Sequence, residues 1–128
     1  QGNHSRSRTC HIYDATKWHR AWRKAVAQAA MIARTRRSEL AYPLTMAVSV
    51  MLQLYCLRPA RPSKSYPRGD ADKFARSCLD GLVQGQLLGD DVQVVELQVS
   101  KRYATPGSYC GCHITIMDAE DPCRTPTP

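Results

Sequence analysis

The longest stretch of two-residue alternation in the chain covers residues 44–57. Apolar side chains recur there at every second position: Met46, Val48, Val50, Leu52, Leu54 and Cys56. Because successive side chains of a β-strand point to opposite faces of a sheet, this alternation predicts a strand with one buried face. Such a strand requires neighbouring strands and a covering layer, so the chain must fold around a sheet.

Two segments with helical periodicity can supply that covering layer. The first runs from Asp14 or Thr16 to about Arg37, and its apolar residues recur at helical spacing: Trp18, Trp22, Val26 and Ala29 or Ala30. We expect both tryptophans to pack in the core. The second segment covers residues 71–84 and has a predicted buried stripe of Phe74, Cys78, Leu79, Leu82 and Val83.

Weaker alternation predicts two more strands, over residues 92–101 and 112–117. In the first of these, Val95, Leu97 and Val99 are expected on one face. A chain of 128 residues has room for one domain. The predicted fold class is α/β (α+β): a single domain in which two helices pack on a small mixed sheet. We expect the domain to cover residues 1–117, and residues 118–128, with their three prolines, to be a disordered tail.

Charge is distributed unevenly along the chain. Residues 1–69 hold 13 Lys and Arg against two acids, a net charge of +11, whereas residues 70–128 carry a net charge of −4. A basic body beside an acidic cluster suits a protein that binds a polyanion and holds a cation against it. The alternative is a solvated basic surface without a ligand. No apolar run approaches the roughly 18 residues of a membrane span.

The six cysteines allow three interpretations. An even number permits a disulfide framework. The segment Cys110-Gly111-Cys112-His113 suggests zinc, although a single C-x-C lacks the paired spacing of structural zinc sites. Cys56 and Cys78 lie within apolar patterns, where a free thiol packs as a small hydrophobe. We expect mostly structural, reduced thiols in a cytoplasmic protein.

Two acidic pairs flank the second predicted helix. Asp70 and Asp72 lie where a basic loop enters this helix, and Asp90 and Asp91 follow the turn after it. If the helix returns the chain against the sheet, both pairs can meet at one end of the domain and bind Mg²⁺. Taken singly, the first pair could instead cap the helix and the second could form a plain turn.

The residues around these pairs resemble the RusA family of Holliday junction resolvases, which are crossover junction endodeoxyribonucleases. The similarity is carried by Arg68-Gly69-Asp70-Ala71-Asp72, Asp80-Gly81-Leu82, Gly89-Asp90-Asp91-Val92-Gln93-Val94-Val95-Glu96-Leu97 and Lys101. It is dense over residues 68–103 and weaker over residues 1–57, where the chain is similar to phage-encoded members. Those members begin with one more strand, so we expect an N-terminal strand to be missing here. A bacterial or phage-infected host cell is implied as the source.

The resemblance implies specific roles for these residues. Asp70, Asp72 and Asp91 correspond to the catalytic carboxylates, with Asp90 as an adjoining metal ligand and Mg²⁺ (or Mn²⁺) as the cofactor. Arg76 takes the place of the family's catalytic lysine, and Lys73 takes that of its asparagine. Basic side chains are expected to hold the DNA backbone: Arg58, Arg61, Lys64, Arg68, Lys73, Lys101 and Arg102. Asp80 is expected to pair with Arg76 at i, i+4. The family implies a homodimer acting on branched DNA, without a membrane.

The two departures, Arg76 and Lys73, leave a second hypothesis open. Arginine keeps a positive charge near the phosphate but cannot give up a proton as a lysine can. The chain is therefore either a metal-dependent nuclease active in DNA recombination and repair or a catalytically weak or inactive protein that binds branched DNA. A third hypothesis, a zinc- or disulfide-stabilised interaction module, depends only on the cysteines.

Overall fold

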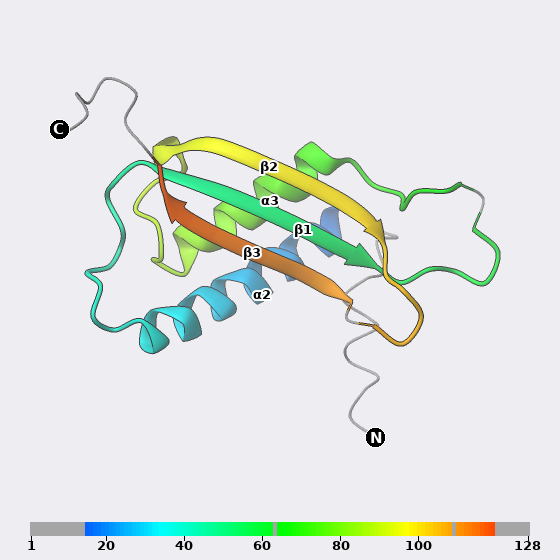
Figure 1. Ribbon diagram of the computed structural model, residues 1–128, viewed down its shortest axis with the longest axis horizontal. Coiled ribbons are helices and arrows are strands. Elements are labelled where there is room, and N and C mark those ends of the chain that lie inside the picture. The colour runs from blue at the N-terminus through cyan, green and yellow to red at the C-terminus, as the bar shows by residue number, and fades with distance from the viewer. Residues whose placement is uncertain (1–14, 63, 109, 120–128) are drawn as a thin grey trace, which may run out of the picture.

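The computed structural model describes residues 15–62, 64–108 and 110–119. The elements along the chain are α2 (Ala15–Arg36), β1 (Val48–Cys56), α3 (Ala71–Gln84), the 3-10 helix η1 (Asp91–Gln93), β2 (Val94–Tyr103) and β3 (Gly111–Asp118). The strands form one sheet in the order β2-β1-β3, and both helices lie on one side of it (Figure 1). The predicted fold class, two helices packed on a small mixed sheet, is confirmed.

The direction of α3 follows from the strand pairing. β1 and β2 are parallel neighbours, whereas β1 and β3 are antiparallel. Parallel neighbours need a crossover connection, which here consists of the basic loop and α3. Consequently α3 runs back along the sheet (Figure 1): it begins near the end of β1 and ends near the start of β2.

The core contains the apolar face of β1, as the alternation predicted. Val48, Val50, Leu52, Leu54 and Cys56 are all buried. Met46 precedes the strand and is 42% exposed, so the predicted strand was too long at its start.

Helix α2 contributes Trp22 to the same core. The Trp22 ring lies 5.6 Å from that of Phe74, and its Nε1 donates a hydrogen bond to Cys78 Sγ at 3.1 Å. This confirms the core position predicted for Trp22. The side chain of Trp18 lies outside the described part of the chain.

The face assignment predicted for β2 is wrong at its start. The register shifts between Val48 and Ser49, which pair with Val94 and Glu96, so Val95 is an extra residue in the ladder. A shift of one residue turns side chains to the opposite face. Val94 therefore packs against the core, whereas Val95 is 58% exposed.

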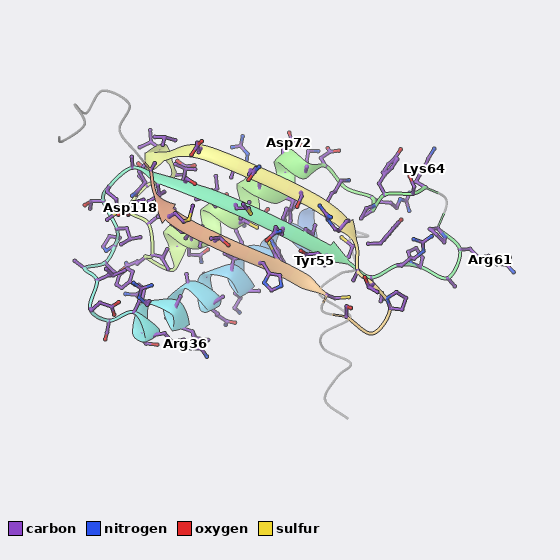
Figure 2. All side chains as sticks on the ribbon, in the orientation of Figure 1. Arg36, Tyr55, Arg61, Lys64, Asp72 and Asp118 are labelled. Carbon is purple, nitrogen blue, oxygen red and sulfur yellow. The ribbon has the colours of Figure 1, made fainter. Side chains whose placement is uncertain are left out.

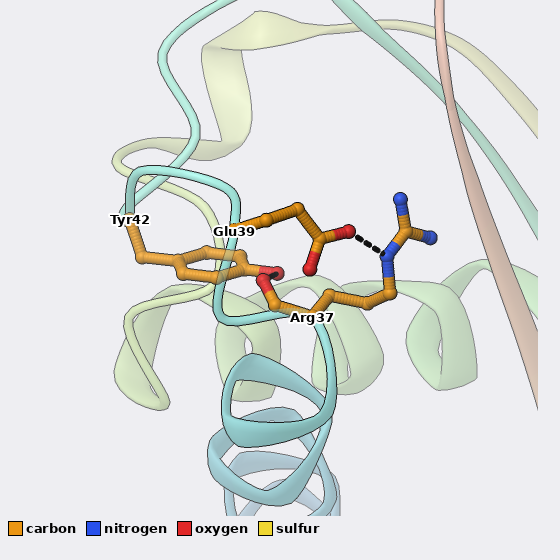
Figure 3. A network of polar contacts seen from close by, with 3 residues as sticks. All are labelled: Arg37, Glu39 and Tyr42. Carbon is orange, nitrogen blue, oxygen red and sulfur yellow. Dashed lines mark hydrogen bonds and ion pairs between the residues drawn. The ribbon is translucent and has the colours of Figure 1, made fainter.

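A small polar network organises the turn after α2 (Figure 3). Arg37 Nε donates to Glu39 Oε2 at 2.6 Å, and Tyr42 Oη donates to the Arg37 carbonyl at 3.1 Å. The hydrogen bond and the opposite charges raise the pKa of Arg37 and lower the pKa of Glu39. Both side chains are exposed, so the pair orders the turn while contributing little free energy of unfolding.

The cysteines within the described part of the chain carry free thiols. These are Cys56, Cys78, Cys110 and Cys112, whereas Cys10 and Cys123 lie outside the described residues.

The predicted disordered tail begins too early. Asp118 ends β3 and so does not belong to such a tail, and residues 120–128 are not among those described. In the described part of the chain, no helix is long and apolar enough to cross a membrane.

Candidate active site

Asp70 and Asp72 lie at the start of α3. Asp70 occupies the N-cap position with an extended backbone, yet its side chain makes no capping hydrogen bond. Its Oδ2 atom instead lies 3.5 Å from Lys73 Nζ, and both side chains are 64% exposed. The alternative role of Asp70 as a side-chain cap therefore finds no support, and its carboxylate faces solvent.

The segment before Asp70 is attached to β2. Lys101 Nζ donates to the Pro67 carbonyl at 2.7 Å and to the Gly69 carbonyl. Tyr103 Oη donates to the Tyr66 carbonyl at 2.9 Å. The strand thus fixes the backbone from which the first acidic pair projects.

Asp90 has a structural role at the other end of α3. Its Oδ1 accepts a hydrogen bond from the Val92 amide at 3.1 Å, and Gln93 Oε1 accepts one from the Asp90 amide at 3.0 Å. These two bonds form a capping box around η1. Gln93 Nε2 also donates to the carbonyls of Leu44 and Met46, at 2.9 and 2.8 Å.

Sequence reasoning assigned Gln93 no role, although it ties η1 to the segment before β1. The signal was present, because Asp90 followed three residues later by Gln93 is the spacing of a capping box. The side chain thereby fixes the direction in which the second acidic pair faces.

The pKa values of the two carboxylates in that pair shift in opposite directions. A hydrogen bond with Asp90 raises the pKa of Asp91 most, followed by burial and the negative charges of Asp90 and Asp80, while Arg76 opposes the shift. The pKa of Asp90 is lowered, chiefly by the Val92 amide. Asp80, Asp90 and Asp91 line an open hollow of about 290 Å³ together with Val83 and Gln84.

One chain does not bring the two acidic pairs together. Asp72 lies at the start of α3 (Figure 2), whereas Asp90 and Asp91 follow the far end of this helix. Fourteen residues of helix span about 20 Å at 1.5 Å per residue. Among the described residues, no three His, Cys, Asp or Glu side chains are grouped as a metal site. The four carboxylates therefore do not form the expected cluster within one chain. Because α3 runs antiparallel to β1 and β2, it places the two acidic pairs at its opposite ends.

The chain matches the model of one known protein family. The model of the RusA endodeoxyribonucleases matches residues 1–116. The chain belongs to the RusA family. No curated protein matches it. Because the family consists of endodeoxyribonucleases, membership supports a nuclease activity, in agreement with the motifs around the two acidic pairs.

Several basic side chains of this RusA-family chain lie on the loop between β1 and α3. Arg61 and Lys64 extend from the loop between β1 and α3, which projects beyond the start of α3 at one end of the molecule (Figure 2). The Arg58 guanidinium lies 5.3 Å from the centre of the Tyr103 ring. Arg68 is exposed beside Asp70 in sequence. The loop that leads into the first acidic pair is therefore basic and exposed at these positions.

The remaining predicted contacts fall elsewhere. Arg102 is exposed on the sheet face opposite the helices, in register with Tyr55. Lys101 is partly exposed, and its Nζ donates to backbone carbonyls. Arg76 is exposed on α3, and the described part of the chain contains no Arg76–Asp80 ion pair, so the predicted i, i+4 pairing is not formed.

Proposed function

We propose that this chain is a Mg²⁺-dependent endonuclease that resolves Holliday junctions or related branched DNA during recombination and repair, with Mn²⁺ as a possible substitute. Membership of the RusA family supports endonuclease activity. The observation that carries the proposal further is the Asp91 carboxylate. It faces the like charges of Asp90 and Asp80, an arrangement that a bound cation would stabilise.

The chemistry of the donor set fits a hard divalent cation. The proposed ligands Asp70, Asp72, Asp90 and Asp91 offer carboxylate oxygens, which Mg²⁺ prefers in proteins. All four side chains are exposed, so each is accessible to a metal ion and to a phosphate. When bound, the metal would supply an activated water and neutralise charge on the phosphate in the transition state.

Other residues of the chain would stabilise and position the DNA. Arg76 can donate two hydrogen bonds to a phosphate whose charge increases in the transition state, and Lys73 adds a second cation one turn earlier. The exposed arginines and lysines of the basic loop would hold the sugar–phosphate backbone without reading its sequence. Selectivity for branched DNA then depends on where two sites are held relative to one another.

We further propose that the functional unit is a homodimer with composite sites. The two acidic pairs lie at opposite ends of α3, so one chain offers half of each predicted ligand set at either end. A two-fold axis near the middle of α3 would bring the Asp70 end of one chain beside the Asp91 end of its partner. Two such sites, related by the two-fold, suit two symmetric nicks across a four-way junction.

Cleavage of a labelled four-way junction tests the proposed nuclease activity. We expect Asp70→Asn and Asp91→Asn to lower Mg²⁺-dependent cleavage by about a hundredfold or more, because each removes charge that holds the metal. Junction binding in EDTA should persist, since the basic surface is intact. Glu96→Gln is the matched control, because Glu96 is an exposed carboxylate on the sheet face opposite the helices. Undiminished cleavage by either aspartate variant would refute the assignment.

The alternative, a branched-DNA-binding protein with weak or no catalysis, is favoured by one observation. The ion pair between Lys73 and Asp70 places an internal cation on a proposed metal ligand. Purified wild-type protein that shifts four-way junctions in a gel, yet nicks none with Mg²⁺ or Mn²⁺, would favour this alternative over the nuclease.

A further inference from the structure

Lys101 has an unusual position for a lysine. In the β1–β2 register it pairs with Leu54, which is buried against the helices, and Val99 and Tyr103 on the same face of β2 also pack against the core. Lys101 therefore points to the helix side of the sheet and is only partly exposed. A lysine stem on such a face can lie along apolar groups, but its ammonium needs polar partners.

Those partners are the backbone carbonyls of one short segment. Lys101 Nζ donates to Pro67 and Gly69 and lies 5.9 Å from the centre of the Tyr66 ring. Tyr103 Oη, on the same face of β2, donates to the Tyr66 carbonyl. Two side chains of one strand thus fix three carbonyls between residues 66 and 69. We call this set of contacts the strand clamp.

The clamped segment ends at Gly69, immediately before Asp70, the N-cap of α3. The next carbonyl, that of Asp70, already accepts the first helical hydrogen bond, from the Phe74 amide at 3.1 Å. Gly69, with φ of +99°, adopts a backbone conformation that favours glycine and turns the chain into the helix. The clamp therefore sets where α3 begins relative to the sheet, and so where Asp70 and Asp72 lie.

We propose that Lys101 is a positioning residue that holds the Asp70–Asp72 carboxylates in place for metal binding, and not a contact to DNA. The inference rests on the proposed function, in which these carboxylates are metal ligands. A site whose ligands are held in advance binds its metal without first ordering the backbone. Loss of the clamp should therefore raise the metal requirement more than it weakens binding of DNA.

Lys101→Met separates these two roles, because methionine keeps an apolar stem while removing charge and donors. Arg102→Met is the matched control: it removes the same charge one residue later, on the opposite face of β2. Tyr103→Phe removes only the hydrogen bond to Tyr66. Three quantities are measured for each variant: the Mg²⁺ concentration for half-maximal junction cleavage, the junction Kd in EDTA with its salt dependence, and metal-free hydrogen exchange over residues 66–78.

For Lys101→Met we expect faster exchange at the Phe74 amide and its neighbours, and a roughly tenfold higher Mg²⁺ requirement. The junction Kd in EDTA should stay within about twofold, because no phosphate contact is lost. Tyr103→Phe should change the hydrogen-exchange rates and the Mg²⁺ requirement in the same direction as Lys101→Met, but by smaller factors. Arg102→Met should leave both unchanged and affect only the Kd and its salt dependence.

The opposite pattern would overturn the proposal. If Lys101→Met weakens junction binding in EDTA, lowers the salt slope by about one and leaves exchange and Mg²⁺ requirement unchanged, Lys101 is a DNA contact. If Lys101→Met does not fold, Tyr103→Phe carries the test, and unchanged exchange near Phe74 overturns the clamp. Wild-type protein that never cuts with Mg²⁺ or Mn²⁺ would instead refute the proposed function, while the exchange data still test the clamp.

Discussion

Asp90 and Asp91 are adjacent and chemically identical, yet their surroundings give their carboxylates different properties. Asp90 accepts a hydrogen bond from a backbone amide, which stabilises its charged form and lowers its pKa. The pKa of Asp91 is raised, first by a hydrogen bond with Asp90, then by burial and by the negative charges of Asp90 and Asp80, and the positive charge of Arg76 only opposes this shift. We therefore expect Asp91, rather than Asp90, to be the primary metal ligand.

Replacing each aspartate by asparagine distinguishes the two roles. Asparagine caps a helix about as well as aspartate, so Asp90→Asn should keep η1 intact. We expect Asp90→Asn to reduce Mg²⁺-dependent cleavage by about tenfold, because the turn that holds Asp91 stays in place, and Asp91→Asn to reduce it by about a hundredfold or more. Single-turnover cleavage rates at saturating Mg²⁺ give this comparison. Equal losses in the two variants would mean that both carboxylates bind the metal directly.

At the scale of elements, the contact between α2 and α3 depends on small residues. A Cβ added at Gly81 would lie 2.7 Å from Val26 Cβ and 2.8 Å from the backbone carbonyl oxygen of Arg23. A Cβ at Gly85 would lie 2.5 Å from the Ala27 carbonyl oxygen. Because backbone atoms of α2 cannot move aside cheaply, glycine at these positions allows the two helices to pack closely.

Gly81→Ala should therefore destabilise the protein although alanine is the better helix former. Overpacking typically costs about 1–3 kcal/mol, and the gain in helix propensity returns up to about 1 kcal/mol. We expect the free energy of unfolding to fall by about 1–2 kcal/mol in urea titrations followed by circular dichroism. Gln84→Ala, at an exposed position of the same helix, should stay within about 0.5 kcal/mol of wild type. A Gly81→Ala variant more stable than wild type would contradict this packing.

The elements themselves follow closely from local sequence patterns. Residues 71–84 were predicted as a helix and form α3 with the same bounds, because periodicity and the glycine that follows agree there. The face of Val95 at the start of β2 could not be predicted, since the shift there depends on pairing with β1 and leaves no local signal. The capping role of Gln93 had a local signal, whereas the clamp by Lys101 depends on two segments 32 to 34 residues apart.

Across the whole molecule, the crossover topology determines where the acidic pairs lie. The pair before α3 lies near the end of β1, and the pair after it lies near the start of β2. Sequence spacing identified the two pairs but could not predict this separation, because it depends on how α3 runs along the parallel strands. The identity of each ligand stays a prediction. A two-chain site reconciles the separated pairs with the metal chemistry proposed for them.

A mixture of two inactive variants tests that two-chain site directly. In a composite dimer of one Asp70→Asn chain and one Asp91→Asn chain, both substitutions fall in the same site, and the other site keeps every carboxylate. We therefore expect the mixture, after subunit exchange, to nick four-way junctions although each variant alone is inactive. If each site is built from one chain, both sites of the mixed dimer carry a substitution and the mixture stays inactive. A mixture of Asp70→Asn and Asp72→Asn is the matched control, because both substitutions lie in the same acidic pair and either arrangement leaves every site damaged. Nicking by the first mixture and not by the second would require that each site draws its two acidic pairs from different chains.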